Sequence, residues 1–353
     1  MTAREPHRGR RLRARIIALF TLLLAANIGA WIWAGSLFHA APAMLGTALL
    51  AWTLGLRHAV DADHIAAIDN VTRKLMQDGT RPISVGLWFA IGHSAVILIA
   101  SVAIAATANA LAQFETLKAA GSVIATIFSA GFLFAIAAIN LVILRSVWKT
   151  FRHVRDGGSY DADDLDVLLA GKGPLSRLFR PLFRLITRPW HMAPLGFLFG
   201  LGFDTATEVA ILGLSTAQAA HGFSFAAVLV FPALFAVGMA LVDTADAILM
   251  LGAYEWAFVR PIRKLYYNVT ITAVSALVAV MIGGIETAAL LADKLNLSGG
   301  VWDVATGLGS HLNLLGFWII GLFASAWIVS FLIYRWMRFD EIAVREPPSA
   351  LAP

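Results

Sequence analysis

The feature that most constrains this chain is the recurrence of long apolar stretches along it. A helix rises about 1.5 Å per residue, so about 20 apolar residues are needed to cross a hydrocarbon layer of about 30 Å. Eight stretches meet this length, at residues 16–38, 41–69, 83–107, 120–148, 192–220, 224–252, 266–291 and 312–334. We therefore expect an all-α polytopic membrane protein with eight transmembrane helices.

The composition agrees with a membrane location and excludes several other classes of protein. Charged residues make up 14% of the chain and hydrophobic residues 59%, whereas an average soluble domain has about 25% charged residues. Because the chain contains no cysteine, disulfide frameworks, iron–sulfur clusters and thiolate zinc sites are excluded. The net charge of +5 is typical of a membrane protein with basic cytoplasmic loops, so no nucleic-acid partner is expected.

The distribution of lysine and arginine predicts the orientation. Of 27 such residues, 24 fall on the side that holds both termini and the even-numbered loops, whereas Lys118 and Lys294 fall on the other side and Arg57 lies inside a stretch. Since basic residues concentrate in cytoplasmic loops, both termini are expected in the cytoplasm. The expected organisation is a basic tail (1–15), helices 1–4 (16–148), a cytoplasmic loop (149–191), helices 5–8 (192–338) and a second cytoplasmic tail (339–353).

Ionisable residues interrupt four of the apolar stretches. A charged group at the bilayer centre costs at least about 2.5–3.5 kcal/mol, so such groups mark sites or pathways. The four clusters are Arg57-His58-Ala-Val-Asp61-Ala-Asp63-His64, Gly92-His93-Ser94, Asp204-Thr205-Ala-Thr207-Glu208 and Asp243-Thr244-Ala-Asp246. Each lies about ten residues, or roughly 13–18 Å, from the cytoplasmic end of its stretch. All four are therefore expected at one level near the midplane of the membrane.

The residue types in these clusters point to a divalent transition metal. Neutral imidazole suits nickel, cobalt, zinc and copper, and carboxylates supply the compensating charge. In a regular helix His58, Asp61 and His64 share one face, whereas Asp63 lies on another and is expected to neutralise Arg57 or to orient a histidine. Because imidazoles must lose their proton to bind metal, binding should weaken as the pH falls through about 6. The candidate metal-binding residues are His58, Asp61, Asp63, His64, His93, Asp204, Glu208, Asp243 and Asp246.

Other polar residues have simpler interpretations. A single buried histidine can be a hydrogen-bonded packing residue, and this alternative stays open for His93 taken alone. Five histidines at loops or helix ends are not expected to bind metal: His39, His153, His191, His221 and His311. An acidic cluster in the long loop is interpreted as a solvated linker: Asp161, Asp163, Asp164 and Asp166. Asn140 and Glu286 stand alone in their stretches.

The polar clusters resemble the signature blocks of a known family, the nickel/cobalt transporters (NiCoT). The segment Arg57–Ile65 resembles the His-x4-Asp-His motif of that family, and the blocks around His93, Asp204 and Asp243 follow in the family's order. The resemblance covers roughly residues 16–338. It implies eight helices, cytoplasmic termini and secondary uptake of Ni²⁺ or Co²⁺ through the cytoplasmic membrane.

The resemblance also bears on the site, on internal symmetry and on location. It implicates His58, Asp63 and His64 in metal recognition, with Asp61 in the same block. Transporters often bind substrate between internal repeats. Aligning the Gly-Leu pairs before the first and third clusters suggests two repeats of four helices, with Asp63 opposite Glu208. We expect a multi-pass protein of the bacterial cytoplasmic (inner) membrane.

The expected function is secondary import of Ni²⁺, Co²⁺ or both, with the ion as substrate and no cofactor. The alternative is an exporter, or a transporter of another divalent metal such as zinc, on the same scaffold. The sequence has no histidine-rich loop of the kind that related exporters often carry, which favours import. An enzyme is not expected, because the chain has neither a His-Glu-x-x-His motif nor His-x-x-His-His boxes. The expected partners are the metal ion and the lipid bilayer, and the sequence predicts neither the oligomeric state nor the nickel-to-cobalt preference.

Overall fold

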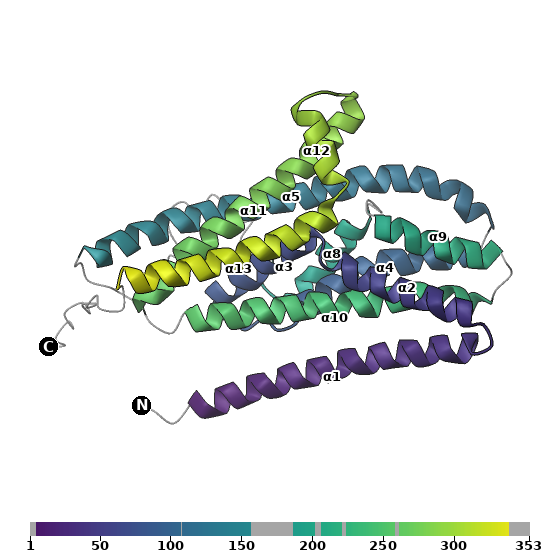
Figure 1. Ribbon diagram of the computed structural model, residues 1–353, viewed down its shortest axis with the longest axis horizontal. Coiled ribbons are helices and arrows are strands. Elements are labelled where there is room, and N and C mark those ends of the chain that lie inside the picture. The colour runs from purple at the N-terminus through teal and green to yellow at the C-terminus, as the bar shows by residue number, and fades with distance from the viewer. Residues whose placement is uncertain are drawn as a thin grey trace. The chain divides into compact units, whose positions relative to one another are not determined.

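The computed structural model describes residues 5–106, 108–156, 186–201, 206–220, 224–257 and 261–338, and these residues form helices and no strand (Figure 1). The helices are α1 (Glu5–Phe38), α2 (Pro42–His58), α3 (Ala62–Gln77), α4 (Val85–Ala106), α5 (Ala108–Arg155), the short η1 (Pro189–His191), α8 (Met192–Gly200), α9 (Ala206–Ala220), α10 (Phe225–Ala257), α11 (Pro261–Leu295), α12 (Val301–Gly309) and α13 (Leu312–Trp336). The expected all-α class is confirmed for these residues. The acidic cluster of the long loop, the tail 339–353 and Asp204 lie outside them.

Six of the described helices are long and apolar enough to cross a membrane. They run over Arg10–Phe38, Val85–Ala103, Gly121–Arg155, Phe225–Tyr254, Leu265–Leu295 and Leu314–Trp336. Each coincides with one of the eight predicted stretches. Large apolar side chains on their surfaces are exposed, as Trp318 of α13 is to 76%, which suits a helix that faces lipid.

The other two predicted stretches, 41–69 and 192–220, are each divided between two shorter helices. In the first, α2 ends at His58 and α3 begins at Ala62. In the second, α8 ends at Gly200 and the described part of α9 begins at Ala206, while residues 202–205 lie outside the described residues. Neither part of either stretch reaches the length of a full membrane span, so the eight continuous transmembrane helices of the prediction are not confirmed. Both divided stretches carry an ionisable cluster at the division.

A tight turn ends α2 directly at the first cluster. The backbone N–H of Val60 donates to the carbonyl of Arg57 at 3.1 Å, and that of Asp61 donates to the carbonyl of His58 at 2.9 Å. These short-range bonds replace the helical pattern for one turn. The chain then re-enters a helix with Asp63 in the first turn of α3, where the positive end of the helix dipole favours a carboxylate. The residues of the first ionisable cluster therefore account for the break between α2 and α3.

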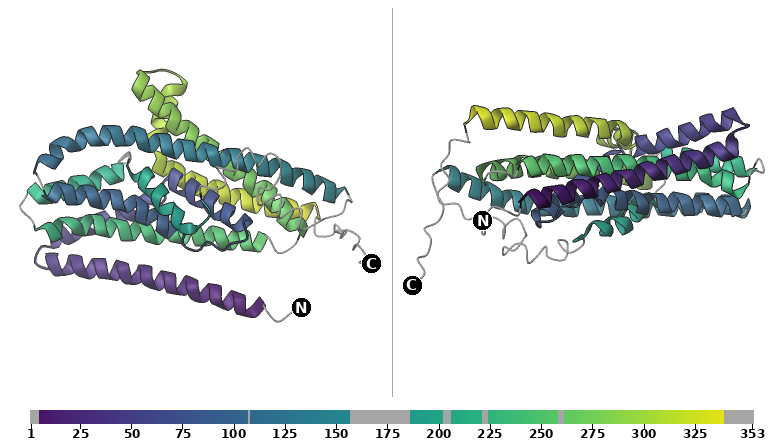
Figure 2. Two further views of the ribbon diagram at one scale, coloured as in Figure 1. Left: turned by 180° about the vertical axis from the view of Figure 1, so that it is seen from behind. Right: turned by 90° about the horizontal axis from the view of Figure 1, so that it is seen from below.

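The helices group into two compact units, of which the first comprises residues 1–61, 83–128 and 189–247. In this unit α1 and α2 form a hairpin, whose turn lies at the right of Figure 1 and at the left of the left view of Figure 2. Helix α4 packs against α8 and α9. Asn27 of α1 donates to the carbonyl of Val237 in α10 at 3.1 Å and accepts from the indole of Trp52 in α2 at 2.9 Å. These bonds hold α1, α2 and the first part of α10 together.

Glycines let helices of the first unit approach backbone to backbone. A Cβ atom at Gly92 of α4 would lie 1.8 Å from the carbonyl oxygen of Ala193 in α8, and one at Gly196 would lie 2.2 Å from that of Phe89. Small residues allow such close approach between membrane helices. His93 follows Gly92 directly, so this contact sets where its side chain lies.

The second unit comprises residues 62–82, 129–188 and 248–353. In it α3 packs against α11 and α13, and Figure 1 shows α11 and α13 side by side, with α12 joining them. Three tyrosine rings meet between α11 and α13: Tyr334 lies 5.6 Å from Tyr266 and 5.8 Å from Tyr267, measured between ring centroids. The described part of this unit thus places α3, with the end of the first ionisable cluster, against two long helices.

Candidate metal centre

His58 is the last residue of α2, and the turn that follows brings Asp61 back to it. The Nδ1 atom of His58 lies 2.8 Å from the Oδ2 atom of Asp61, and both side chains are buried. Because an ionised carboxylate only accepts hydrogen bonds, Nδ1 of His58 carries the hydrogen and donates it. The Nε2 atom of a neutral His58 then presents its lone pair on the opposite side of the ring.

The lone pair of His58 faces His93, which comes from the middle of α4. The two Nε2 atoms are 2.8 Å apart, and the same Nε2 atom of His93 lies 3.0 Å from Oε1 of Glu208 in the first turn of α9. His93 and Glu208 are each only 2% exposed. Two acceptors, a lone pair and a carboxylate oxygen, therefore converge on one ring nitrogen.

These spacings suit a single bound cation. Two ligand atoms at about 2.1 Å from an ion and at right angles to each other lie about 3.0 Å apart. The observed separations of 2.8 and 3.0 Å are close to that value. An ion that took the place of the shared hydrogen could bind Nε2 of His58, Nε2 of His93 and Oε1 of Glu208 once the proton of His93 had moved to Nδ1 or left.

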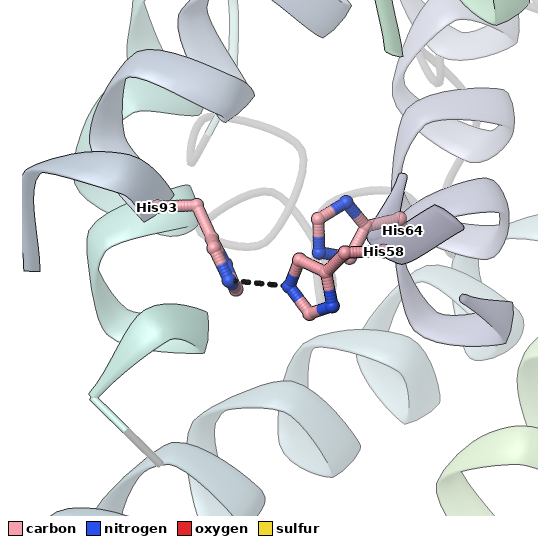
Figure 3. A group of neighbouring side chains, drawn as sticks. All are labelled: His58, His64 and His93. Carbon is pink, nitrogen blue, oxygen red and sulfur yellow. Dashed lines mark hydrogen bonds between the residues drawn. The ribbon is translucent and has the colours of Figure 1, made fainter. Parts of the chain in front are cut away.

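A third imidazole belongs to the same group. Figure 3 shows the rings of His58 and His93 facing each other, with the ring of His64 beside that of His58. One ring nitrogen from each of the three lies within 4.8 Å of the others, and all three residues are buried. His64 lies in the first turn of α3, three residues after Asp61.

Asp61 has a different position from the one that a regular helix predicts. That prediction placed its carboxylate between His58 and His64, whereas the turn at 59–61 directs Oδ2 to the Nδ1 side of His58, away from the nitrogen that faces His93. Its Oδ1 atom is buried and accepts no hydrogen bond from the residues that the structure describes. A buried carboxylate oxygen without a donor is costly, and a nearby cation would offset that cost.

The remaining candidates have known positions but no established part in this group. Asp63 stands in the first turn of α3, and Asp243 and Asp246 lie in α10. Asp243 is fully buried, and a Cβ atom at Gly86 of α4 would lie 2.0 Å from its backbone oxygen. The helix that carries Asp243 therefore packs directly on the helix that carries His93. Asp204 lies outside the described residues.

Two aromatic residues at the site were not predicted. The ring of Phe235 in α10 lies 5.4 Å from that of His58, and the ring of Phe89 in α4 lies 6.0 Å from that of His93. They cover the imidazoles with apolar surface, which strengthens charge–charge interactions at the site by excluding water. The residues around them in the sequence are apolar, so their position at the site could not be predicted from composition. The one sequence sign was that Phe89 precedes His93 by one helical turn and so lies on the same face of α4.

Comparison with known proteins identifies the family of the chain. The model of a family described as high-affinity nickel-transport protein (NicO) matches residues 44–333 of the chain. The chain is 60% identical over 336 residues to the high-affinity nickel transport protein of Cupriavidus necator, covering 95% of this chain and 96% of that protein. It is 45% identical over 299 residues to the nickel transporter NixA of Staphylococcus aureus (84% and 88% covered). It is 36% identical over 322 residues to the cobalt transport protein NhlF of Rhodococcus rhodochrous (90% and 91% covered).

No solved structure matches the chain. The family match extends over most of the sequence and includes all four ionisable clusters. The resemblance noted from the motifs is thereby confirmed, and so is a multi-pass location in a bacterial membrane. The chain belongs to the family of high-affinity nickel-transport proteins.

Proposed function

We propose that this chain is a secondary transporter that imports Ni²⁺, Co²⁺ or both across the bacterial cytoplasmic membrane. The observation that carries the proposal is the convergence of buried His58, His93 and Glu208 at separations of 2.8 and 3.0 Å. The printed names of relatives, nickel transporters in several organisms and a cobalt transport protein in another, support the choice of ions.

In this proposal each residue of the group has its own role. Nε2 of His58, Nε2 of His93 and Oε1 of Glu208 bind the ion, and His64 supplies a further nitrogen. Asp61 fixes the tautomer of His58 through Nδ1, as carboxylates next to metal-binding histidines do. Three imidazoles without thiolates suit Ni²⁺ and Co²⁺, and the Glu208 charge offsets part of the cost of dehydrating a divalent ion.

The proposed topology has eight crossings, with α2–α3 and α8–α9 as two broken ones and both termini cytoplasmic. Transporters commonly place substrates where membrane helices are discontinuous, because the freed backbone groups line the site. A membrane potential that is negative inside favours inward movement of a divalent ion by about 4.6 kcal/mol per 100 mV. This potential alone can drive accumulation, so the proposal requires no cofactor and no enzymatic activity.

The other predicted carboxylates belong to the proposal as supporting charges. Asp63, Asp204, Asp243 and Asp246 would lower the electrostatic energy of the ion on its way to and from the histidines. The full burial of Asp243, and its position in the helix α10 that packs on α4, support this role for Asp243.

The test is uptake of trace radioactive nickel and cobalt by cells that lack their own transporters. Wild type should show saturable uptake, and His58→Ala should abolish it at equal membrane expression. His39→Ala is the matched control, because His39 is an exposed histidine whose ring bonds only the nearby carbonyl of Ser36 among the described contacts. Normal uptake by His58→Ala would refute the site. Absence of uptake by well-expressed wild type, with accelerated loss from preloaded cells, would show export instead.

A further inference from the structure

A second group of buried polar side chains lies in the second unit, beyond the metal motif. We call it the α3 network: Asp69, Asn70 and Arg73 of α3, Asn140 of α5, Tyr254 of α10, and Thr272 and Ser275 of α11. Every member is at most 3% exposed. Buried charges are costly in a membrane protein, so the presence of this buried polar network requires an explanation.

Asp69 is held by two hydroxyl groups from different helices. The phenol of Tyr254 donates to its Oδ1 atom, and the hydroxyl of Ser275 donates to its Oδ2 atom at 2.7 Å. Both carboxylate oxygens therefore have a donor, one from α10 and one from α11. These two hydrogen bonds fix the face of α3 that is turned toward α10 and α11.

Arg73, one turn further along α3, compensates the charge of Asp69. Its guanidinium donates to the hydroxyl of Thr272 in α11 at 2.9 Å and to Oδ1 of Asn70 at 3.0 Å. The same Asn70 oxygen accepts from the side-chain amide of Asn140 in α5 at 2.6 Å. The network thus connects α3 to α5, α10 and α11 and contains one negative and one positive charge.

The chemistry of the α3 network excludes a second binding station for the transported ion. Most of its members are neutral hydroxyl and amide groups, and Arg73 places a permanent positive charge among them. A divalent cation would be repelled by that charge and would find the oxygens of Asp69 and Asn70 already occupied by hydrogen bonds. The network is built to hold a helix and not to hold a metal ion.

We propose that the α3 network positions His64 for ion binding by fixing the rotation and height of α3. This inference rests on the proposed function, since it assigns His64 to the ion. His64 stands in the first turn of α3, and Asp69 and Arg73 stand five and nine residues further along the same helix. An apolar helix surface can slide or rotate against its neighbours at little cost, whereas buried polar pairs that must meet their partners specify one register.

The charge balance of the network gives the proposal a sharp test. Asp69→Asn leaves the buried Arg73 charge uncompensated, and Arg73→Gln leaves Asp69 uncompensated, so each single change should displace α3. The double variant Asp69→Asn/Arg73→Gln has no net buried charge and retains groups that can hydrogen-bond. It should therefore recover much of what each single change loses.

The experiment measures Ni²⁺ affinity by calorimetry and the visible absorption of bound Co²⁺, on purified full-length protein in detergent. We expect each single variant to weaken Ni²⁺ binding about tenfold or more, as loss of groups that orient a metal-binding residue does. The Co²⁺ spectrum, which reports the arrangement of the ligands, should change as well. The double variant should return both measurements toward wild type.

A milder variant and a matched control keep the test decisive. Ser275→Ala removes one donor to Asp69 without changing charge, and it serves if a charge variant does not fold. The control is Ser129→Ala, which removes a hydrogen bond of 2.8 Å from Ser129 to Glu286 in the same unit but outside the α3 network. It should leave the Ni²⁺ affinity and the Co²⁺ spectrum unchanged.

The outcomes separate this inference from the proposed function. Folded Asp69→Asn, Arg73→Gln and Ser275→Ala variants with wild-type affinity and Co²⁺ spectrum would overturn the positioning role, while loss of binding in His58→Ala would leave the proposed site intact. A double variant no better than the worse single one would also overturn the role. Wild-type binding by His58→Ala would instead refute the proposed function.

Discussion

The geometry of His58 makes Asp61→Asn the most informative single substitution. Asp61 accepts from Nδ1 of His58 at 2.8 Å, so Nε2 of His58 carries the lone pair that would bind the ion in the proposed site. Asparagine has nearly the same shape but no charge, and it can offer Nδ1 either an oxygen or an amide hydrogen. In the second orientation His58 would take the other tautomer and carry its hydrogen on Nε2, where it blocks metal binding.

The magnitude follows from the role that the proposed site gives to Asp61. Loss of a carboxylate that orients a metal-binding histidine typically costs 10- to 100-fold in affinity, or about 1.4–2.7 kcal/mol. We therefore expect Asp61→Asn to weaken Ni²⁺ binding by that factor while the ion keeps the same ligands. Titration calorimetry on purified protein measures the affinity, and the absorption of bound Co²⁺ reports the ligand arrangement. Asp293→Asn, at an exposed carboxylate near the end of α11, is the control.

Two results would refute this reasoning. An unchanged affinity in a folded Asp61→Asn protein would show that the carboxylate does not orient His58 in the metal-bound state. A changed Co²⁺ spectrum with a much larger loss would show that Asp61 binds the ion itself, as the regular-helix interpretation of the sequence had it.

Three further predictions follow from the same structure. Gly196→Ala places a methyl group 2.2 Å from the carbonyl oxygen of Phe89, so α4 and α8 must separate and the protein should lose about 1–3 kcal/mol of stability. Thermal unfolding in detergent measures this loss, and Gly213→Ala, with nothing within 4 Å of the added atom, is its control. Glu208→Gln keeps the shape but removes the charge 3.0 Å from Nε2 of His93, so Ni²⁺ affinity should fall at least tenfold in calorimetry; unchanged affinity would exclude the carboxylate from the site. Ni²⁺ affinity should also fall as the pH drops through about 6, because protons then compete for the imidazoles. Binding that is constant from pH 7.5 to 5 would contradict a histidine site.

Hydropathy predicted the six long spans because each is a single continuous apolar helix. It did not indicate the break within 41–69 for a physical reason: a sum over a window records how apolar a segment is and not whether its backbone continues as a helix. The turn at 59–61 depends on a few local hydrogen bonds, such as that from Asp61 to the carbonyl of His58. The charged residues after Leu56 were the available sign that this stretch differs from the others.

Sequence reasoning predicted which residues lie close together better than it predicted the geometry in which they meet. Depth counting placed His58 and His93 at one level, and the structure joins them at 2.8 Å. Depth contains no information on rotation about each helix axis, so the meeting of His93 with Glu208 could not be derived. The α3 network was missed because hydropathy treats Asp69 and Arg73 as the polar end of a span, and Asn140 was noted only as an isolated residue.

The alignment of the two broken stretches connects the helix breaks to the chemistry. The register derived from two Gly-Leu pairs places Asp63 opposite Glu208, and the structure puts each in the first turn of the second helix of its stretch, α3 or α9. A helix start in the membrane exposes backbone N–H groups, and an acidic side chain stabilises that positive end. Glu208 shows that the same carboxylate can also face an imidazole at 3.0 Å. In the proposed site one acidic residue would therefore stabilise a helix start and also supply charge for the cation, which accounts for the acidic residues in the first turns of α3 and α9.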